Sequence, residues 1–241
     1  MTTLFVSDLH LDSERPDIAS QFMDFLVGEA RQAETLYVLG DLFEAWIGDD
    51  DPEPVKHRIM RAVHDLADSG VACFFMAGNR DFLTGDVFRA RTGFKILPDP
   101  TVVNLYGERV LLSHGDSLCT DDVQYQRFRR MVRDPLWQQD FLNQSVEHRS
   151  AMVAQARDAS RAHTTGMAPE IMDINKGAAD NAMRAHGVSI LVHGHTHRPA
   201  VHSFVLDGRP ATRIVLGDWY EQGSMLRWRT GQEYELVSLP R

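Results

Sequence analysis

The sequence predicts an α/β fold arranged as a sandwich of two mixed sheets. In the first third of the chain, short apolar runs alternate with amphipathic helical stretches. Near the C-terminus, several strand-like runs follow one another and are separated only by turn residues. Alternation is typical of parallel strands joined by helices, whereas consecutive strands are typical of antiparallel hairpins. The two patterns together favour mixed sheets.

Three buried strands and two helices are expected in the first third. The strands are predicted at residues 3–6, 35–39 and 71–76, and each ends in a polar loop that contains metal-ligand residue types or glycine. A helix is expected to begin near Pro16, because apolar residues then recur at helical spacing. A second such pattern covers residues 55–66.

Hairpins are expected in the rest of the chain. Residues 101–105 and 109–113 flank Gly107, which is typical of a tight turn. Four further strands are predicted, in this order along the chain: 201–206, 213–216, 224–228 and 233–237.

One segment, residues 121–170, interrupts this rhythm. It is helical in composition and combines apolar residues with seven arginines: Arg127, Arg129, Arg130, Arg133, Arg149, Arg157 and Arg161. We therefore expect one domain over residues 1–241, with a helical insertion at 121–170 that covers part of the core. A plain solvated helical hairpin would explain the same periodicity.

Composition narrows the functional classes. The net charge of −9 argues against broad nucleic-acid binding, which needs clustered Lys and Arg. The two cysteines, Cys73 and Cys119, are expected to be buried, inert thiols in a reducing compartment. No apolar stretch approaches the roughly 20 residues of a membrane span, and no signal segment is apparent, so a cytoplasmic location is expected.

Seven residues of metal-ligand type follow strand-like runs in five separate loops. They are Asp8, His10, Asp41, Asn79, His114, His195 and His197. Each alone is more often a hydrogen-bonding loop residue, but their joint occurrence beside glycines points to a shared site. Carboxylate, amide and imidazole donors suit divalent ions such as Mn²⁺, Zn²⁺, Fe²⁺ or Co²⁺.

In this order the motifs Asp-X-His, Gly-Asp, Gly-Asn, His-Gly and Gly-His-X-His resemble the five blocks of calcineurin-like metallophosphoesterases. The resemblance implies a four-layer αββα sandwich that holds two metal ions. It implies one ion on Asp8, His10, Asp41 and His197, and a second on Asp41, Asn79, His114 and His195, with Asp41 bridging. Where many members have histidine after Gly-Asn, this chain has Arg80, which is expected to clamp a substrate phosphate.

Longer strings, including Gly40-Asp41-Leu42-Phe43-Glu44-Ala45-Trp46-Ile47-Gly48-Asp49-Asp50, resemble one group of that family, the UDP-2,3-diacylglucosamine diphosphatases of Gram-negative bacteria. That group hydrolyses UDP-2,3-diacylglucosamine to UMP and 2,3-diacylglucosamine 1-phosphate (lipid X) in lipid A biosynthesis, typically with Mn²⁺. A helical cap receives the acyl chains. The resemblance implies two Mn²⁺ per chain and peripheral association with the cytoplasmic face of the inner membrane, with no nucleic-acid partner.

The same resemblance assigns residue roles. Catalytic roles fall to Asp41, Asn79, Arg80 and His195. Substrate contacts fall to Asn79, Arg80, Asp122, Tyr125, Arg157, Ser160, Thr164 and His195. Some relatives have Asn at position 164 and Lys at position 167, where this chain has Thr164 and Met167, so a polar contact from residue 167 is in doubt. The alternatives are a broader metal-dependent nucleotide phosphodiesterase and a non-catalytic scaffold of the same fold.

Overall fold

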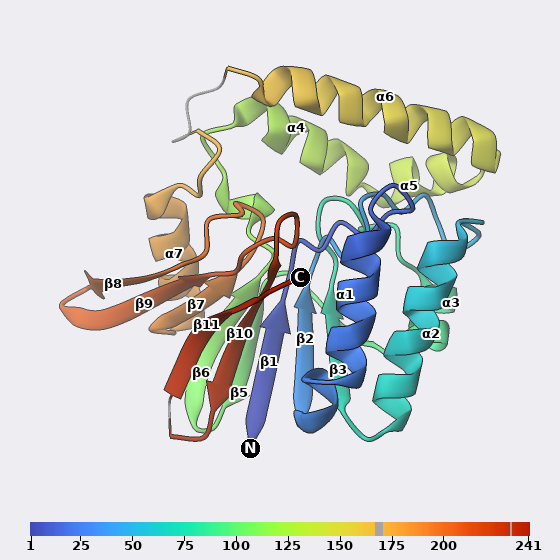
Figure 1. Cartoon of the computed structure of the whole chain (residues 1–241). Coiled ribbons are helices and arrows are strands. Elements are labelled where there is room, and N and C mark those ends of the chain that lie inside the picture. Colours follow the sequence, from blue (N-terminus) through green and yellow to red (C-terminus); the bar gives the residue numbers. More distant parts are fainter. Residues whose placement is uncertain (167–170, 232) are drawn as a thin grey trace.

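The computed structural model describes residues 1–166, 171–231 and 233–241, with only the backbone of Thr164. Two mixed sheets face each other, as predicted (Figure 1). The first has the strand order β11-β10-β1-β2-β3-β4, and the second has the order β5-β6-β7-β9-β8.

The first sheet has a parallel centre and an antiparallel edge. Its strands are β1 (Thr2–Val6), β2 (Thr35–Leu39), β3 (Ala72–Met76), β4 (Lys95–Leu97), β10 (Gly223–Arg229) and β11 (Glu233–Leu239). Strands β1 to β4 run parallel, while β10 pairs antiparallel with both β1 and β11. The predicted strands at both ends of the chain therefore meet in one sheet.

The second sheet is also mixed. Its strands are β5 (Thr101–Leu105), β6 (Glu108–Ser113), β7 (Ile190–His193), β8 (Ala200–Leu206) and β9 (Arg209–Val215). The pairs β5–β6 and β8–β9 are the two predicted hairpins, and β6, β7 and β9 run parallel between them.

Alternate residues of the strands build three stacked cores, which define four layers. Leu4 and Val38 face helices α1 (Pro16–Val27) and α2 (Pro54–Asp68), whereas Phe5 and Leu39 face the second sheet. On the far side, Leu191 packs against α7 (Lys176–His186). This alternation follows from the two-residue period of a strand. The αββα sandwich is confirmed.

Three helices occupy the predicted insertion: α4 (Val123–Val132), α5 (Pro135–Leu142) and α6 (Val146–Thr164). They lie across the ends of β1 and β2 toward which the strand arrows point (Figure 1). Buried Arg149 of α6 donates to the carbonyl of Ile47 at 2.6 Å and pairs with Asp50. Residues 167–170 of the predicted insertion, including Met167, lie outside the described residues.

The sequence patterns did not indicate α7, the short helix α3 (Asp86–Thr92), the one-turn helices η1 (Ala30–Gln32) and η2 (Asp116–Leu118), or edge strand β4. Within the described ranges, no helix combines the length and apolar character that crossing a membrane requires.

Candidate metal centre

The predicted ligand residues meet where the two sheets end. Parallel strands β1, β2 and β3 bring the loops with Asp8, Asp41 and Asn79 to one edge of the first sheet. Parallel strands β6 and β7 bring His114 and His195 to the matching edge of the second sheet. Five loops that are distant in sequence therefore converge, because carboxyl ends of parallel strands share an edge.

Five of the seven predicted ligand residues have a left-handed backbone, with φ between 52° and 69°: Asp8, His10, Asp41, His195 and His197. Among the described residues, the only other non-glycine residues with positive φ are Tyr106 and Asp207, which precede glycine in hairpin turns. Residues without glycine's freedom rarely adopt this conformation, and it clusters at functional sites. The fold holds these side chains in place at a conformational cost.

The ligand atoms lie at distances that suit a shared cation. The Nε2 atoms of His10 and His197 are 3.3 Å apart, and His197 Nε2 is 3.4 Å from Asp8 Oδ1. Asp41 Oδ2 is 3.9 Å from His10 Nε2, while its Oδ1 is 3.7 Å from His114 Nε2. Two ligand atoms that share one ion are about 3.0–3.5 Å apart, since metal–nitrogen distances are about 2.0–2.1 Å.

These residues form two groups, Asp8 with His10 and His197, and Asp8 with Asp41 and His114. Within each group the potential ligand atoms all lie within 4.8 Å of one another. Asp41 directs one oxygen toward His10 and the other toward His114, which is the arrangement a bridging carboxylate needs.

The imidazoles are oriented for metal binding by contacts on their other nitrogen. Nδ1 of His114 is 2.9 Å from the carbonyl of Leu39, and Nδ1 of His197 is 3.3 Å from Asp218 Oδ2. In both cases Nε2 remains directed at the centre. Buried Asp8 Oδ1 has no hydrogen-bond partner among the described residues. A buried carboxylate oxygen that accepts no hydrogen bond and lies 3.4 Å from an imidazole nitrogen fits a shared divalent cation.

The other two predicted ligands border this centre. Asn79 Oδ1 is 3.0 Å from His114 Nε2. The ring of His195 lies 5.1 Å from that of His114, and its backbone N–H donates to Asp8 Oδ2 at 2.9 Å. His195 is in neither of the two close groups, although the structure places it beside them.

The charges at the centre favour added positive charge. Burial lowers the pKa of His114, but Asp41, Asp116 and Asp8 outweigh it and raise the pKa to about 9. Burial and the neighbouring His114 lower the pKa of His195 to about 4, so this imidazole is neutral near pH 7. A neutral imidazole can act as a ligand, and carboxylates that stabilise a protonated histidine also stabilise a metal cation.

One buried residue, Asp81, organises the two central loops. Its carboxylate accepts backbone N–H groups of Gly78 at 2.8 Å and Leu42 at 2.7 Å, and of Asp41 at 3.3 Å. Burial and the charge of Asp41 raise its pKa to about 6. No role was predicted for Asp81 from the sequence, although its place after Gly78-Asn79-Arg80 was a usable signal.

The predicted substrate residues of the helical insertion contact different parts of the protein. Tyr125 donates to Asp116 at 2.8 Å, and its ring is 5.9 Å from that of His195. Asp122 caps α4 by accepting the Tyr125 N–H at 2.9 Å. Arg157 pairs with Glu44 at 2.6 Å. Ser160 and Thr164 are in α6, and the Thr164 side chain lies outside the described residues.

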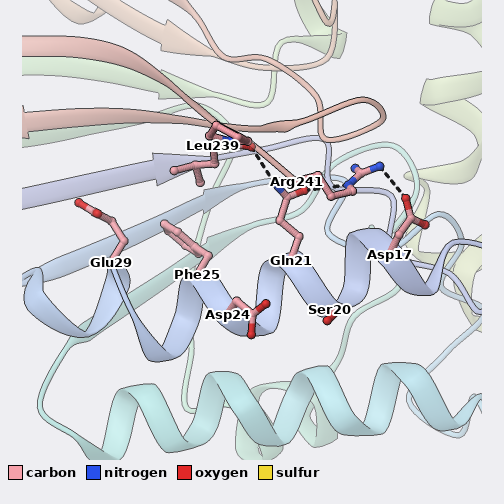
Figure 2. Close-up of a pocket in the computed structure, with 9 residues that line it drawn as sticks. Asp17, Ser20, Gln21, Asp24, Phe25, Glu29, Leu239 and Arg241 are labelled. Atoms are coloured by element: carbon pink, nitrogen blue, oxygen red, sulfur yellow. Dashed lines mark hydrogen bonds and ion pairs between the residues drawn. The ribbon is translucent and has the colours of Figure 1, made fainter.

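A separate groove of about 460 Å³ lies between α1 and the C-terminal residues (Figure 2). Arg241 pairs there with Asp17 at 2.6 Å and donates to the carbonyl of Trp219 at 2.7 Å. None of the seven predicted ligand residues lines this groove. We therefore assign the chemistry to the histidine and carboxylate cluster.

Comparison with known proteins agrees with the sequence motifs. A model of the calcineurin-like phosphoesterase family matches residues 1–199. The UDP-2,3-diacylglucosamine hydrolase of Stenotrophomonas maltophilia (strain K279a) is 51% identical over 238 residues, covering 96% of each chain. That of Xanthomonas oryzae pv. oryzae (strain PXO99A) is 52% identical over 234 residues, or 94% of this chain and 95% of the relative. That of Escherichia coli O127:H6 is 49% identical over 240 residues, covering both chains in full. The predicted resemblance is confirmed.

Proposed function

Because the chain belongs to the calcineurin-like phosphoesterase family, we propose that it hydrolyses the pyrophosphate bond of UDP-2,3-diacylglucosamine with water. The products would be UMP and 2,3-diacylglucosamine 1-phosphate. One observation supports this substrate: relatives named for hydrolysis of this molecule share 51% and 49% sequence identity with the chain over nearly its full length. The convergence of carboxylates and imidazoles supports the reaction type.

We assign the metal site to two Mn²⁺. Asp8, His10, Asp41 and His197 would hold one ion, and Asp41, Asn79, His114 and His195 the other. When bound, such a pair of ions lowers the pKa of water and neutralises charge on a phosphoryl group. Two features support this assignment: the two oxygens of Asp41 are directed at His10 and at His114, and Oδ1 of Asp8 accepts no hydrogen bond among the described residues.

The residues of the chain orient the substrate around that centre. Arg80 lies beside Asp41, to which its backbone N–H donates at 2.9 Å. Its buried Nε has no hydrogen-bond partner among the described residues, so the guanidinium has donors left for a phosphate. Tyr125, Arg157 and Asp122 would contact the substrate from the insertion, which we propose to be a cap over the site.

We propose that the cap also rests on an anionic membrane surface. Exposed apolar side chains on α4 and α5 include Val123, Phe128, Met131 and Leu136. Exposed Arg127 and Arg130 are on the same helix α4. Apolar and basic side chains on one helical surface support peripheral binding to anionic lipid.

Membrane binding is tested by sedimentation with vesicles that contain phosphatidylglycerol or only phosphatidylcholine. We expect binding to the anionic vesicles, and a loss of binding in the variant Phe128→Glu/Met131→Glu. Val205→Glu is the control, because Val205 is an exposed apolar residue of β8 outside the cap. If the wild-type protein sediments with neither kind of vesicle, or equally with both, this part of the proposal is rejected.

Activity is tested by UMP release from UDP-2,3-diacylglucosamine by metal-stripped protein, with and without Mn²⁺. We expect Mn²⁺-dependent release that Asp41→Ala abolishes. Turnover of only bis(p-nitrophenyl) phosphate would instead indicate a broader phosphodiesterase. No turnover of either compound by folded, Mn²⁺-loaded protein would indicate a scaffold.

A further inference from the structure

The carboxylate of Glu44 contacts two functional side chains at once. Its Oε2 lies 2.7 Å from Nδ1 of His10, a predicted metal ligand. Its Oε1 accepts from Nη2 of Arg157 at 2.6 Å. Neither His10 Nδ1 nor Glu44 Oε2 has another hydrogen-bond partner among the described residues. Glu44 thus connects the centre with helix α6.

The backbone places Glu44 beside His10. The loop after β1 and the loop after β2 continue the parallel pairing of their strands. The N–H of His10 donates to the carbonyl of Asp41 at 3.0 Å, and the N–H of Glu44 donates to that of Leu11 at 3.2 Å. The side-chain contact is therefore built on a fixed main-chain register.

The contact on His10 determines which ring nitrogen faces the centre. A carboxylate next to Nδ1 accepts a hydrogen bond from the Nδ1–H group, which keeps the proton on Nδ1 and leaves the Nε2 lone pair for a metal. Outer carboxylates of this kind fix the ring orientation and increase the basicity of the ligand. His10 Nε2 does face His197 and Asp41.

The contact on Arg157 restrains a long, flexible side chain. Arg157 belongs to α6, more than one hundred residues away in sequence, and its side chain is about one quarter exposed. Ordering such a side chain on binding costs conformational entropy. Pairing it in advance with Glu44 would lower that cost.

We propose that Glu44 is a positioning residue that fixes His10 for metal binding through one carboxylate oxygen and fixes Arg157 for substrate binding through the other. This inference rests on the proposed function, since it assumes a metal ion on His10 and a substrate under the cap. It makes the geometry of the cap and that of the metal centre depend on one side chain.

A second acid of the same loop provides a matched control. Asp50 pairs with Arg149 of α6 through two hydrogen bonds, so it also joins this loop to the cap. No contact between Asp50 and a predicted ligand is found in the described part of the chain. Loosening of the cap alone would therefore affect Asp50 and Glu44 variants alike.

The first test is Mn²⁺ binding to metal-stripped protein by titration calorimetry. We expect Glu44→Ala to weaken binding about 10- to 100-fold. Glu44→Gln keeps an oxygen that accepts from His10 Nδ1, so its affinity should stay much closer to wild type. Asp50→Asn and Arg157→Ala should bind Mn²⁺ as wild type does. Equal affinity of Glu44→Ala and wild type, or equal weakening in Asp50→Asn, would overturn the role toward His10.

The second test is the kinetics of UMP release at saturating Mn²⁺. Glu44→Gln should raise KM about two- to tenfold with little change in kcat, because Arg157 is then ordered only on binding. An unchanged KM would overturn the role toward Arg157. Failure of wild type to bind Mn²⁺ or to release UMP would instead reject the proposed function, so the two failures are distinct.

Discussion

The ring of Tyr220 stacks on the ring of His10, with centroids 5.2 Å apart and planes at 12°. The same tyrosine lies 5.7 Å from the ring of His197. Tyr220 is 39% exposed, so it forms a solvent-facing cover over two predicted metal ligands. Asp218 contacts His197 from the same loop, which joins β9 to β10.

Replacing Tyr220 tests whether this cover supports the ligands. Stacked rings contribute about 0.5–1.5 kcal/mol beyond area burial. We expect Tyr220→Ala to weaken Mn²⁺ binding about two- to twelvefold. Tyr220→Phe, which keeps the ring, should bind as wild type in titration calorimetry. Equal weakening in both variants would assign the effect to the hydroxyl group instead.

Gly78 and Gly194 leave space for two carboxylates. A Cβ atom at Gly78 would collide with the Asp41 carboxylate, and one at Gly194 would collide with the Asp8 carboxylate and the Ser7 hydroxyl group. Neither glycine has positive φ, so the effect is steric. We expect Gly78→Ala and Gly194→Ala each to lower kcat/KM for UMP release at least 100-fold, because displacement of a ligand by about 1 Å is that costly.

The control for these variants is Gly177→Ala in the first turn of α7. A Cβ atom there would approach only the Asn175 side chain, at 3.2 Å. Near-wild-type activity is expected. Activity in Gly78→Ala equal to that of Gly177→Ala would mean that the Asp41 carboxylate need not stay in place.

The sequence patterns were sufficient to predict the two mixed sheets and the loops of the site, but not the layer that α7 forms beside the second sheet. Strand periodicity located β1 and β2, and each delivers a ligand residue at its end. Glycines beside the ligand candidates marked close approaches, which Gly78 and Gly194 bear out. Local patterns succeed here because strand alternation and loop chemistry are determined by residues that are close together in the sequence.

The long-range contacts could not be predicted in the same way. The link between Glu44 and Arg157 joins residues 113 apart, and the stack of Tyr220 on His10 depends on how β10 pairs with β1. The place of Asp81 in its motif marks it in the sequence, but only the fold shows that its carboxylate accepts three backbone N–H groups. Such roles arise from tertiary packing.

Asp116 anchors the cap to the second sheet. This fully buried carboxylate accepts from Tyr125 at 2.8 Å and from Arg129 at 2.8 Å, and both residues belong to α4. Without Asp116, the Tyr125 hydroxyl loses its acceptor and, among the described residues, Arg129 keeps only the more distant Asp99 carboxylate, at 4.0 Å. Asp116→Ala should therefore lower the free energy of unfolding by about 3 kcal/mol. Urea denaturation measures this loss.

Asp158→Ala is the control for Asp116→Ala. Asp158 forms an exposed pair with Arg161 on α6, and exposed pairs contribute little. Its unfolding curve should superimpose on that of wild type. If both alanine variants unfold at the wild-type urea concentration, Asp116 does not anchor the cap.

The two buried thiols give a prediction about pH. Burial raises the pKa of both Cys73 and Cys119 to about 12, from an ordinary value of 9.0. The thiolate is the reactive form, so neither cysteine should react with a disulfide reagent at pH 8 in the native protein. Both should react in urea.

Because the folded pKa of these thiols lies above the unfolded one, their contribution to stability is present below pH 9.0 and is lost as pH rises toward about 12. The Cys73→Ser/Cys119→Ser variant should lose less stability over that interval, and an identical loss would show that other groups cause it.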